Sequence, residues 1–301
     1  MLFSFLWVPV TLVAALAQTA RNLTQRSLID AIGVIGATQV RFLYGLPFSL
    51  VFLAMICLFS GSTPPAANAS FLAFDTTGAL SQIVATALML AAMRERSFAL
   101  TTTYTKTEPV QVALFGALVL GDALSPLKLA AVLIATAGVI LMAWKPGEKL
   151  ASAGLKPALL GIGAGAFFAL AAIGFRGAIL SLPLEASFLM RAGITLVWGL
   201  AIQSAVLLIY LALFDRKALT ASFMAWKPSL QAGFLGAFAS QFWFIGFSLT
   251  SAANVRTLAL VEVLFAQVIS RKLFTERQSP RELIGMALVV AGVALILLQA
   301  F

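Results

Sequence analysis

Two acidic residues, Glu108 and Glu262, each stand near the middle of a long apolar stretch. A carboxyl group at the centre of a bilayer costs about 2.5–3.5 kcal/mol on insertion scales, so such residues usually face a bundle interior, a cavity or an ionic partner. A buried carboxyl group also holds its proton more tightly unless a cation compensates its charge. We therefore expect Glu108 or Glu262 to exchange protons near neutral pH.

The alternative for both glutamates is a structural role, in which Lys106 or an arginine neutralises the carboxylate and holds two helices together. Lys106 and Glu108 are two positions apart, so they do not share a helix face and a simple pair within one helix is not expected.

Arginines and aromatic residues are the other candidates for binding. Arg41 and Arg191 lie about one turn inside apolar stretches, where they can either bind a substrate carboxylate or extend to the membrane interface. Deep aromatic side chains can line a cavity for an aromatic or amphipathic solute, although most such residues pack or face lipid. The aromatic candidates are Tyr104, Trp198, Phe242 and Trp243. Asp122 and Glu276 fall at the ends of stretches and are expected to order turns.

The composition indicates a membrane protein. Of 301 residues, 61% are hydrophobic and 10% charged, whereas soluble domains carry roughly 25% charged residues. The chain has no histidine and a single cysteine, Cys57, which excludes an internal disulfide, histidine catalysis, histidine metal sites and cysteine-cluster metal or Fe–S sites. No phosphate-binding Gly-Lys-Ser/Thr loop is present. We expect no enzyme activity, no catalytic residue, no metal and no cofactor.

The apolar stretches predict an all-α integral membrane protein with ten transmembrane helices. The predicted spans are 2–20, 32–59, 71–93, 98–121, 126–144, 157–179, 186–214, 230–251, 255–274 and 282–300.

The two halves of the chain resemble each other. At an offset of 154 residues, Glu108 falls on Glu262 and Asp122 falls on Glu276. The same offset superposes the Ser-Pro pairs at 125–126 and 279–280, and the Ala-Gly-Val triplets at 137–139 and 291–293. We predict a five-helix repeat in residues 1–150 and a second in residues 151–301. An odd number of spans forces the two repeats into opposite orientations, a common plan of secondary transporters.

The positive charges indicate the topology. Fourteen of the 20 lysines and arginines, beginning with Arg21 and Arg26, fall in or next to the odd-numbered connections. The other side of the membrane holds three, all near the ends of spans: Lys128, Arg176 and Arg256. The positive-inside rule places the first group in the cytoplasm and both termini outside. It also explains the net charge of +9 better than nucleic-acid binding does.

The repeats, each with a polar turn followed by a span containing Ala-Gly-Val, resemble the drug/metabolite transporter superfamily of the EamA type. The resemblance covers the whole chain and is clearest at 107–122, which includes Pro109 of the fourth span, and at 279–293. Val263 stands where the family would have a second proline, and the predicted outward termini differ from the family's usual inward termini.

The resemblance implies a multi-pass secondary transporter of the bacterial inner membrane. It implies efflux of a small organic solute, such as an amino acid, a related metabolite or an amphipathic drug, in exchange for protons and by alternating access around a midplane cavity. The alternatives are an uncoupled facilitator or channel, a membrane enzyme acting on lipid, and a non-transporting subunit.

Overall fold

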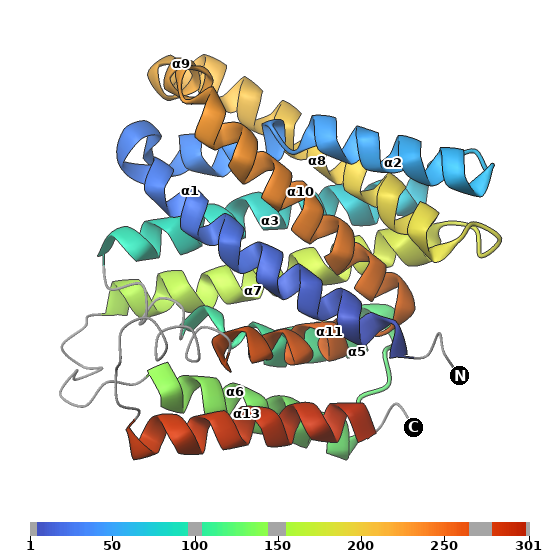
Figure 1. Ribbon diagram of the computed structural model, residues 1–301, viewed down its shortest axis with the longest axis vertical. Helices are drawn as coiled ribbons and strands as arrows, with labels where there is room; N and C mark the ends of the chain where they lie inside the picture. Colours follow the sequence, from blue (N-terminus) through green and yellow to red (C-terminus); the bar gives the residue numbers. More distant parts are fainter. Residues whose placement is uncertain (1–4, 96–103, 144–154, 265–278, 299–301) are drawn as a thin grey trace.

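The computed structural model describes residues 5–95, 104–143, 155–264 and 279–298 (Figure 1). Within these residues the regular structure is helical and includes no strand. The first half holds α1 (Trp7–Leu43), α2 (Leu46–Ser60), α3 (Ala69–Glu95), α5 (Glu108–Leu120) and α6 (Pro126–Ala143). The second half holds α7 (Leu155–Ser181), α8 (Phe188–Phe214), α9 (Arg216–Met224), α10 (Trp226–Leu249), α11 (Ala252–Leu258), the short η3 (Ala259–Val261) and α13 (Pro280–Leu298).

The first helix corrects two predictions. Residues 21–31, expected as a connection, continue α1 because no glycine or proline interrupts them before Gly33. Gly33 has φ 72° and ψ 175°, a conformation that L side chains rarely adopt, and the helix changes direction there. Arg21, counted among the connecting residues, lies inside α1 and is only 2% exposed. The predicted second span, 32–59, corresponds to the apolar segment Ile32–Ser60, which holds the end of α1 and all of α2 with a turn at Tyr44 and Gly45 between them.

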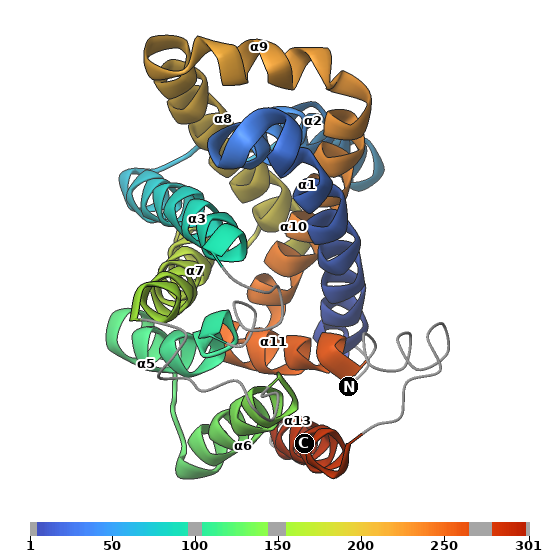
Figure 2. The same cartoon turned by 90° about the vertical axis from the view of Figure 1, so that its left-hand side faces the viewer.

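Three long-range helix pairs hold the halves together. α1 packs along α10, α3 along α7, and α6 along α13, so each pair joins the first half of the chain to the second (Figures 1 and 2). Glycines permit the close approach in two of these pairs. A Cβ on Gly138 would lie 2.6 Å from the carbonyl oxygen of Gly285, and one on Gly174 would lie 2.6 Å from the backbone nitrogen of Gly78.

The described helices account for part of the predicted spans. By length and composition, six of them can cross a membrane: Ile32–Ser60, Ala69–Ala92, Leu159–Ser181, Phe188–Phe214, Trp226–Leu249 and Pro280–Leu298. Two further apolar helices, Glu108–Leu120 and Pro126–Met142, are shorter. The first, fourth, fifth, ninth and tenth predicted spans extend beyond the described residues, so the count of ten is not confirmed.

The outer surface of the bundle is apolar. Large hydrophobic side chains point outward, including Leu58 at 81%, Phe59 at 86% and Leu118 at 82% exposure. An apolar surface of this kind is stable in lipid and not in water. The chain is therefore a multi-pass membrane protein.

Candidate functional site

The two candidate glutamates lie where α5 meets α11 and η3, and both are ion-paired. The carboxylate of Glu108, at the start of α5, lies 3.1 Å from Nε of Arg256 in α11. Lys106, just before α5, pairs with Glu262, just after η3. Each glutamate therefore takes its cation from the other half of the chain. We call these contacts the crossed ion pairs.

The crossed ion pairs are mostly buried. The side chains of Arg256 and Glu108 are 10% and 14% exposed, and those of Lys106 and Glu262 are 15% and 13% exposed. Removing one partner from a buried pair leaves an uncompensated charge, which costs about 3–5 kcal/mol. The geometry thus provides the helix-to-helix ties that the structural alternative for these residues requires.

The start of α5 follows from its local sequence. A turn at Lys106 and Thr107 precedes the helix, and Pro109 occupies its first turn, where the missing N–H of proline is tolerated. Glu108 at the N-terminus of α5 is also favoured by the helix dipole. These features place the Glu108 carboxylate at a helix end, where it is free to meet α11.

Two more candidates lie near the crossed ion pairs. The guanidinium carbon of Arg256 lies 4.5 Å from the ring centre of Trp243, a cation–π distance. The indole nitrogen of Trp243 donates to Oε1 of Gln18 at 3.0 Å, so this buried tryptophan joins α10 to α1. Arg41 is 3% exposed and donates to Oγ1 of Thr86 at 3.2 Å. Arg41 is therefore a core residue and does not extend to the interface.

The remaining candidates lie elsewhere. Trp198 is 40% exposed on α8 and meets the ring of Phe71 edge-on. Tyr104 packs over α7, where a Cβ on Gly161 would lie 2.5 Å from Cβ of the tyrosine.

The last two candidates, Phe242 and Arg191, take no part in the crossed ion pairs. Phe242 packs on Phe238, with ring centres 4.8 Å apart. Arg191, in the first turn of α8, has Nε and Nη1 buried without a hydrogen-bond partner. The structure therefore unites Glu108, Glu262 and Lys106, with Trp243 and Arg41 near them.

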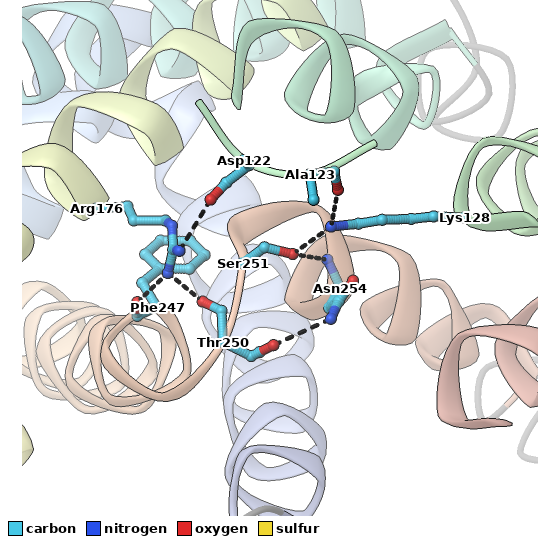
Figure 3. A network of polar contacts seen from close by, with 8 residues as sticks. All are labelled: Asp122, Ala123, Lys128, Arg176, Phe247, Thr250, Ser251 and Asn254. Atoms are coloured by element: carbon cyan, nitrogen blue, oxygen red, sulfur yellow. Dashed lines mark hydrogen bonds and ion pairs between the residues drawn. The ribbon is translucent and has the colours of Figure 1, made fainter. Parts of the chain in front are cut away.

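A second polar network joins the halves at the junction of α10 and α11 (Figure 3). Arg176 of α7 donates to the carbonyl oxygens of Phe247, at 2.8 Å, and Thr250, and it pairs with Asp122 at 3.0 Å. Lys128 of α6 donates to Oγ of Ser251 at 2.9 Å. Asp122 therefore does more than order a turn, and Arg176 and Lys128 are not free loop cations. Glu276 lies outside the described residues.

Sequence reasoning missed a buried acid. Asp75 of α3 is 0% exposed, and neither of its carboxyl oxygens has a hydrogen-bond partner. Further along α3, Gln82 accepts a hydrogen bond of 2.8 Å from Nε2 of Gln203 in α8. The available signal was an acidic residue four positions after the start of the predicted span 71–93. Arg256 gave a similar signal one residue into the ninth predicted span.

Fold and site together define an all-helical membrane protein whose halves are held together by buried ion pairs. The model of the EamA-like transporter family matches residues 5–144 and again residues 155–298. The chain therefore belongs to the EamA-like transporter family, which confirms the resemblance seen in its sequence. It is a membrane transporter of small solutes and not an enzyme.

One solved structure, described only as "Crystal structure of protein", shares this fold with a TM-score of 0.70 and 16% sequence identity. The match covers 98% of this chain and 97% of that chain. No curated protein matches the chain.

Proposed function

We propose that the chain is a proton-coupled secondary transporter of the bacterial inner membrane that exports a small organic solute. Ten helices form two inverted repeats, residues 1–150 and 151–301, with both termini outside. The crossed ion pairs are the observation that carries this proposal. Two glutamates that correspond at the 154-residue offset each hold a cation from the opposite repeat.

The helix pairs support the inverted repeat. In the predicted numbering, α1 and α10 represent spans one and eight, and α3 and α7 represent spans three and six. A two-fold relation between the repeats exchanges span one with six and span three with eight. It therefore turns the α1–α10 pair into the α7–α3 pair, and both are main contacts of the bundle.

Coupling follows from the chemistry of the crossed ion pairs. A protonated glutamate no longer attracts its cation, so uptake of a proton by Glu108 or Glu262 weakens one tie between the repeats. Loss of that tie favours rearrangement of the halves around the site, as alternating access requires. If the crossed ion pairs only fasten helices, the chain is an uncoupled facilitator.

Flux into proteoliposomes tests this function. Vesicles containing the purified protein and an internal pH dye are offered amino acids, nucleosides, sugars, organic cations and organic anions, with and without an imposed pH gradient. We expect one class to cross at a rate that depends on the gradient, and its movement to change the internal pH. Gradient-independent flux would show a facilitator, and absence of flux throughout the panel would contradict solute transport.

Variants assign the coupling residues. Glu108→Gln and Glu262→Gln remove a titratable group while keeping the side-chain shape, and Glu185→Gln is a matched change at an exposed position. We expect at least one of the first two to lose the response to pH, while the control keeps it. Retention of the response in both variants would exclude coupling through these glutamates.

A further inference from the structure

Three arginines are buried in the core beside the crossed ion pairs. Arg21 and Arg41 of α1 are 2% and 3% exposed, and Arg256 of α11 is 9% exposed. We call Arg21, Arg41 and Arg256 the arginine cluster. Arginine does not lose its proton in proteins, so each member carries a positive charge inside the bundle.

The three side chains share one small region. A Cβ on Gly236 of α10 would lie 3.1 Å from Cγ of Arg41 and 3.6 Å from Cδ of Arg21, so both stems pack on the same point of that helix. Trp243, whose ring lies under Arg256, is two turns further along α10. The three positive charges repel one another: Arg41 is repelled by Arg21 and by Arg256, and Arg21 is repelled by Arg256.

The positive charge of this region exceeds the negative charge. Lys106 and the three arginines contribute four positive charges, whereas Glu108 and Glu262 contribute two negative charges. Both glutamates are already ion-paired, with Arg256 and Lys106 respectively. Within the described part of the chain, neither Arg21 nor Arg41 meets a carboxylate. Arg21 donates from Nη2 to Oδ1 of Asn22 at 2.7 Å, while its Nε and Nη1 are buried without a hydrogen-bond partner.

A buried charge without a partner is strongly unfavourable, and guanidinium groups cannot relieve the cost by deprotonation. Donors that are buried, charged and unpaired are therefore suited to a ligand that brings negative charge. Guanidinium groups bind carboxylates and phosphates through two parallel hydrogen bonds, which adds geometric selectivity. The ring of Trp243 offers an apolar face beside Arg256.

We infer that the transported solute is a small organic anion, whose carboxylate or phosphate group binds the arginine cluster. This inference rests on the proposed function, since it names the chemical class of the solute. The unpaired donors are Nε and Nη1 of Arg21, and Arg41, which donates to Thr86, adds a second guanidinium group between α1 and α10. Arg256 adds positive charge and holds the site next to Glu108. A soluble anion fits this position better than a lipid headgroup, because the cluster lies in the core and not on the exposed apolar surface.

Thermal unfolding of the purified full-length protein with charge-matched probes tests the inference. One set is benzoate, benzyl alcohol and benzylammonium, and a second is glycerol 3-phosphate and glycerol, together with succinate. At 100 times its Kd, a bound ligand raises Tm by about 4 °C for a chain of this length. We expect this rise with at least one of the anions and none with the neutral or cationic analogues.

Three outcomes would overturn the inference. The first is no rise with any anion, and the second is an equal rise with the neutral analogues. The third is a rise confined to chloride, inorganic phosphate or micelles containing phosphatidylglycerol, which would identify an inorganic ion or a lipid as the occupant. These binding measurements do not depend on flux. Binding of an anion without flux would therefore reject the proposed transport and support the anion site. Flux of a neutral or cationic solute would support the proposed transport and reject the anion as its solute.

Variants separate a binding role from a packing role. Arg21→Gln and Arg41→Gln each remove one excess charge, so we expect the anion-free protein to unfold at a higher temperature and the anion-induced rise to disappear. A purely structural arginine gives the opposite, a lower Tm. Arg41→Lys keeps the positive charge but loses the planar guanidinium group. We expect it to raise the Kd of the anion at least tenfold without raising the Tm of the anion-free protein. Lys217→Gln, at an exposed position, is the control and should change neither quantity.

Discussion

Replacing Glu108 with glutamine removes the negative charge opposite Arg256 and keeps the shape of the side chain. The two groups lie 3.1 Å apart in a mostly buried pair. At an effective dielectric constant of about 20, two unit charges at this distance attract each other by about 5 kcal/mol. Truncating one partner of such a pair typically costs about 3–5 kcal/mol. Unfolding a chain of 301 residues has an entropy of about 0.6 kcal/mol per degree, so Tm should fall by roughly 5–8 °C.

The charge balance predicts unequal effects for the two partners. Glu108→Gln raises the excess of positive charge in the region from two to three, whereas Arg256→Gln lowers it to one and leaves Glu108 within electrostatic reach of Lys106. We therefore expect Arg256→Gln to cost less than Glu108→Gln. The double variant restores the original excess and should recover part of the loss.

Tryptophan fluorescence during heating in detergent measures these Tm values, with Glu185→Gln as an exposed control that should shift Tm by less than about 1 °C. An unchanged Tm for Glu108→Gln, or an equal loss for Arg256→Gln, would refute the assigned charge balance.

Three further predictions concern other parts of the bundle. Asp75→Asn should maintain or raise Tm, because it keeps the shape of the side chain and removes a buried acid that has no hydrogen-bond partner. A fall in Tm of several degrees would show that the carboxyl group has a stabilising partner. Arg176→Gln should lower Tm by a few degrees, since it removes charged hydrogen bonds that link α7 to the end of α10, and a neutral result would mean that water replaces them. Gly138→Ala should lower Tm, because its Cβ would lie 2.6 Å from the carbonyl oxygen of Gly285. Gly163→Ala should maintain or raise Tm, because the nearest atom to its Cβ lies 3.6 Å away. The reverse order of the two Tm values would contradict the α6–α13 packing.

The sequence predicted the helical membrane class, because that class depends on local composition. The structural alternative for the glutamates named Lys106 or an arginine as the neutralising cation, and the structure pairs Glu262 with Lys106 and Glu108 with an arginine. The sequence did not identify Arg256 as a partner, since the positive-inside rule counts charges by their position along the chain and treats a cation near a span end as solvated. Arg21 was misplaced for the same reason. Whether such a cation is solvated depends on which helix packs against it, and single-residue patterns carry no information about long-range packing.

The aromatic candidates show the same limit. Trp198 and Trp243 both lie inside apolar stretches, yet one is on the outer surface and the other is buried under Arg256. In a membrane helix, lipid-facing and core-facing positions are both apolar, so hydrophobic periodicity does not separate them. A more informative signal was the spacing of polar residues: Gln18 and Arg21 share one face of α1, three positions apart, and both face the core.

The arginine cluster and the crossed ion pairs share Arg256, which fixes the sign of their interaction. An ionised Glu108 competes with an anionic solute for the same positive charge, so a proton on Glu108 should strengthen anion binding. Glu108→Gln imitates the protonated state, so the Kd of a bound anion in this variant, measured by titration at constant pH, tests this competition. If the Kd falls at least fivefold, reciprocity means that the anion favours proton uptake at Glu108 and that proton and anion move in the same direction. That outcome would contradict export by proton exchange and favour cotransport. An unchanged Kd would separate Glu108 from the anion and leave exchange through Glu262 as the coupling reaction to test.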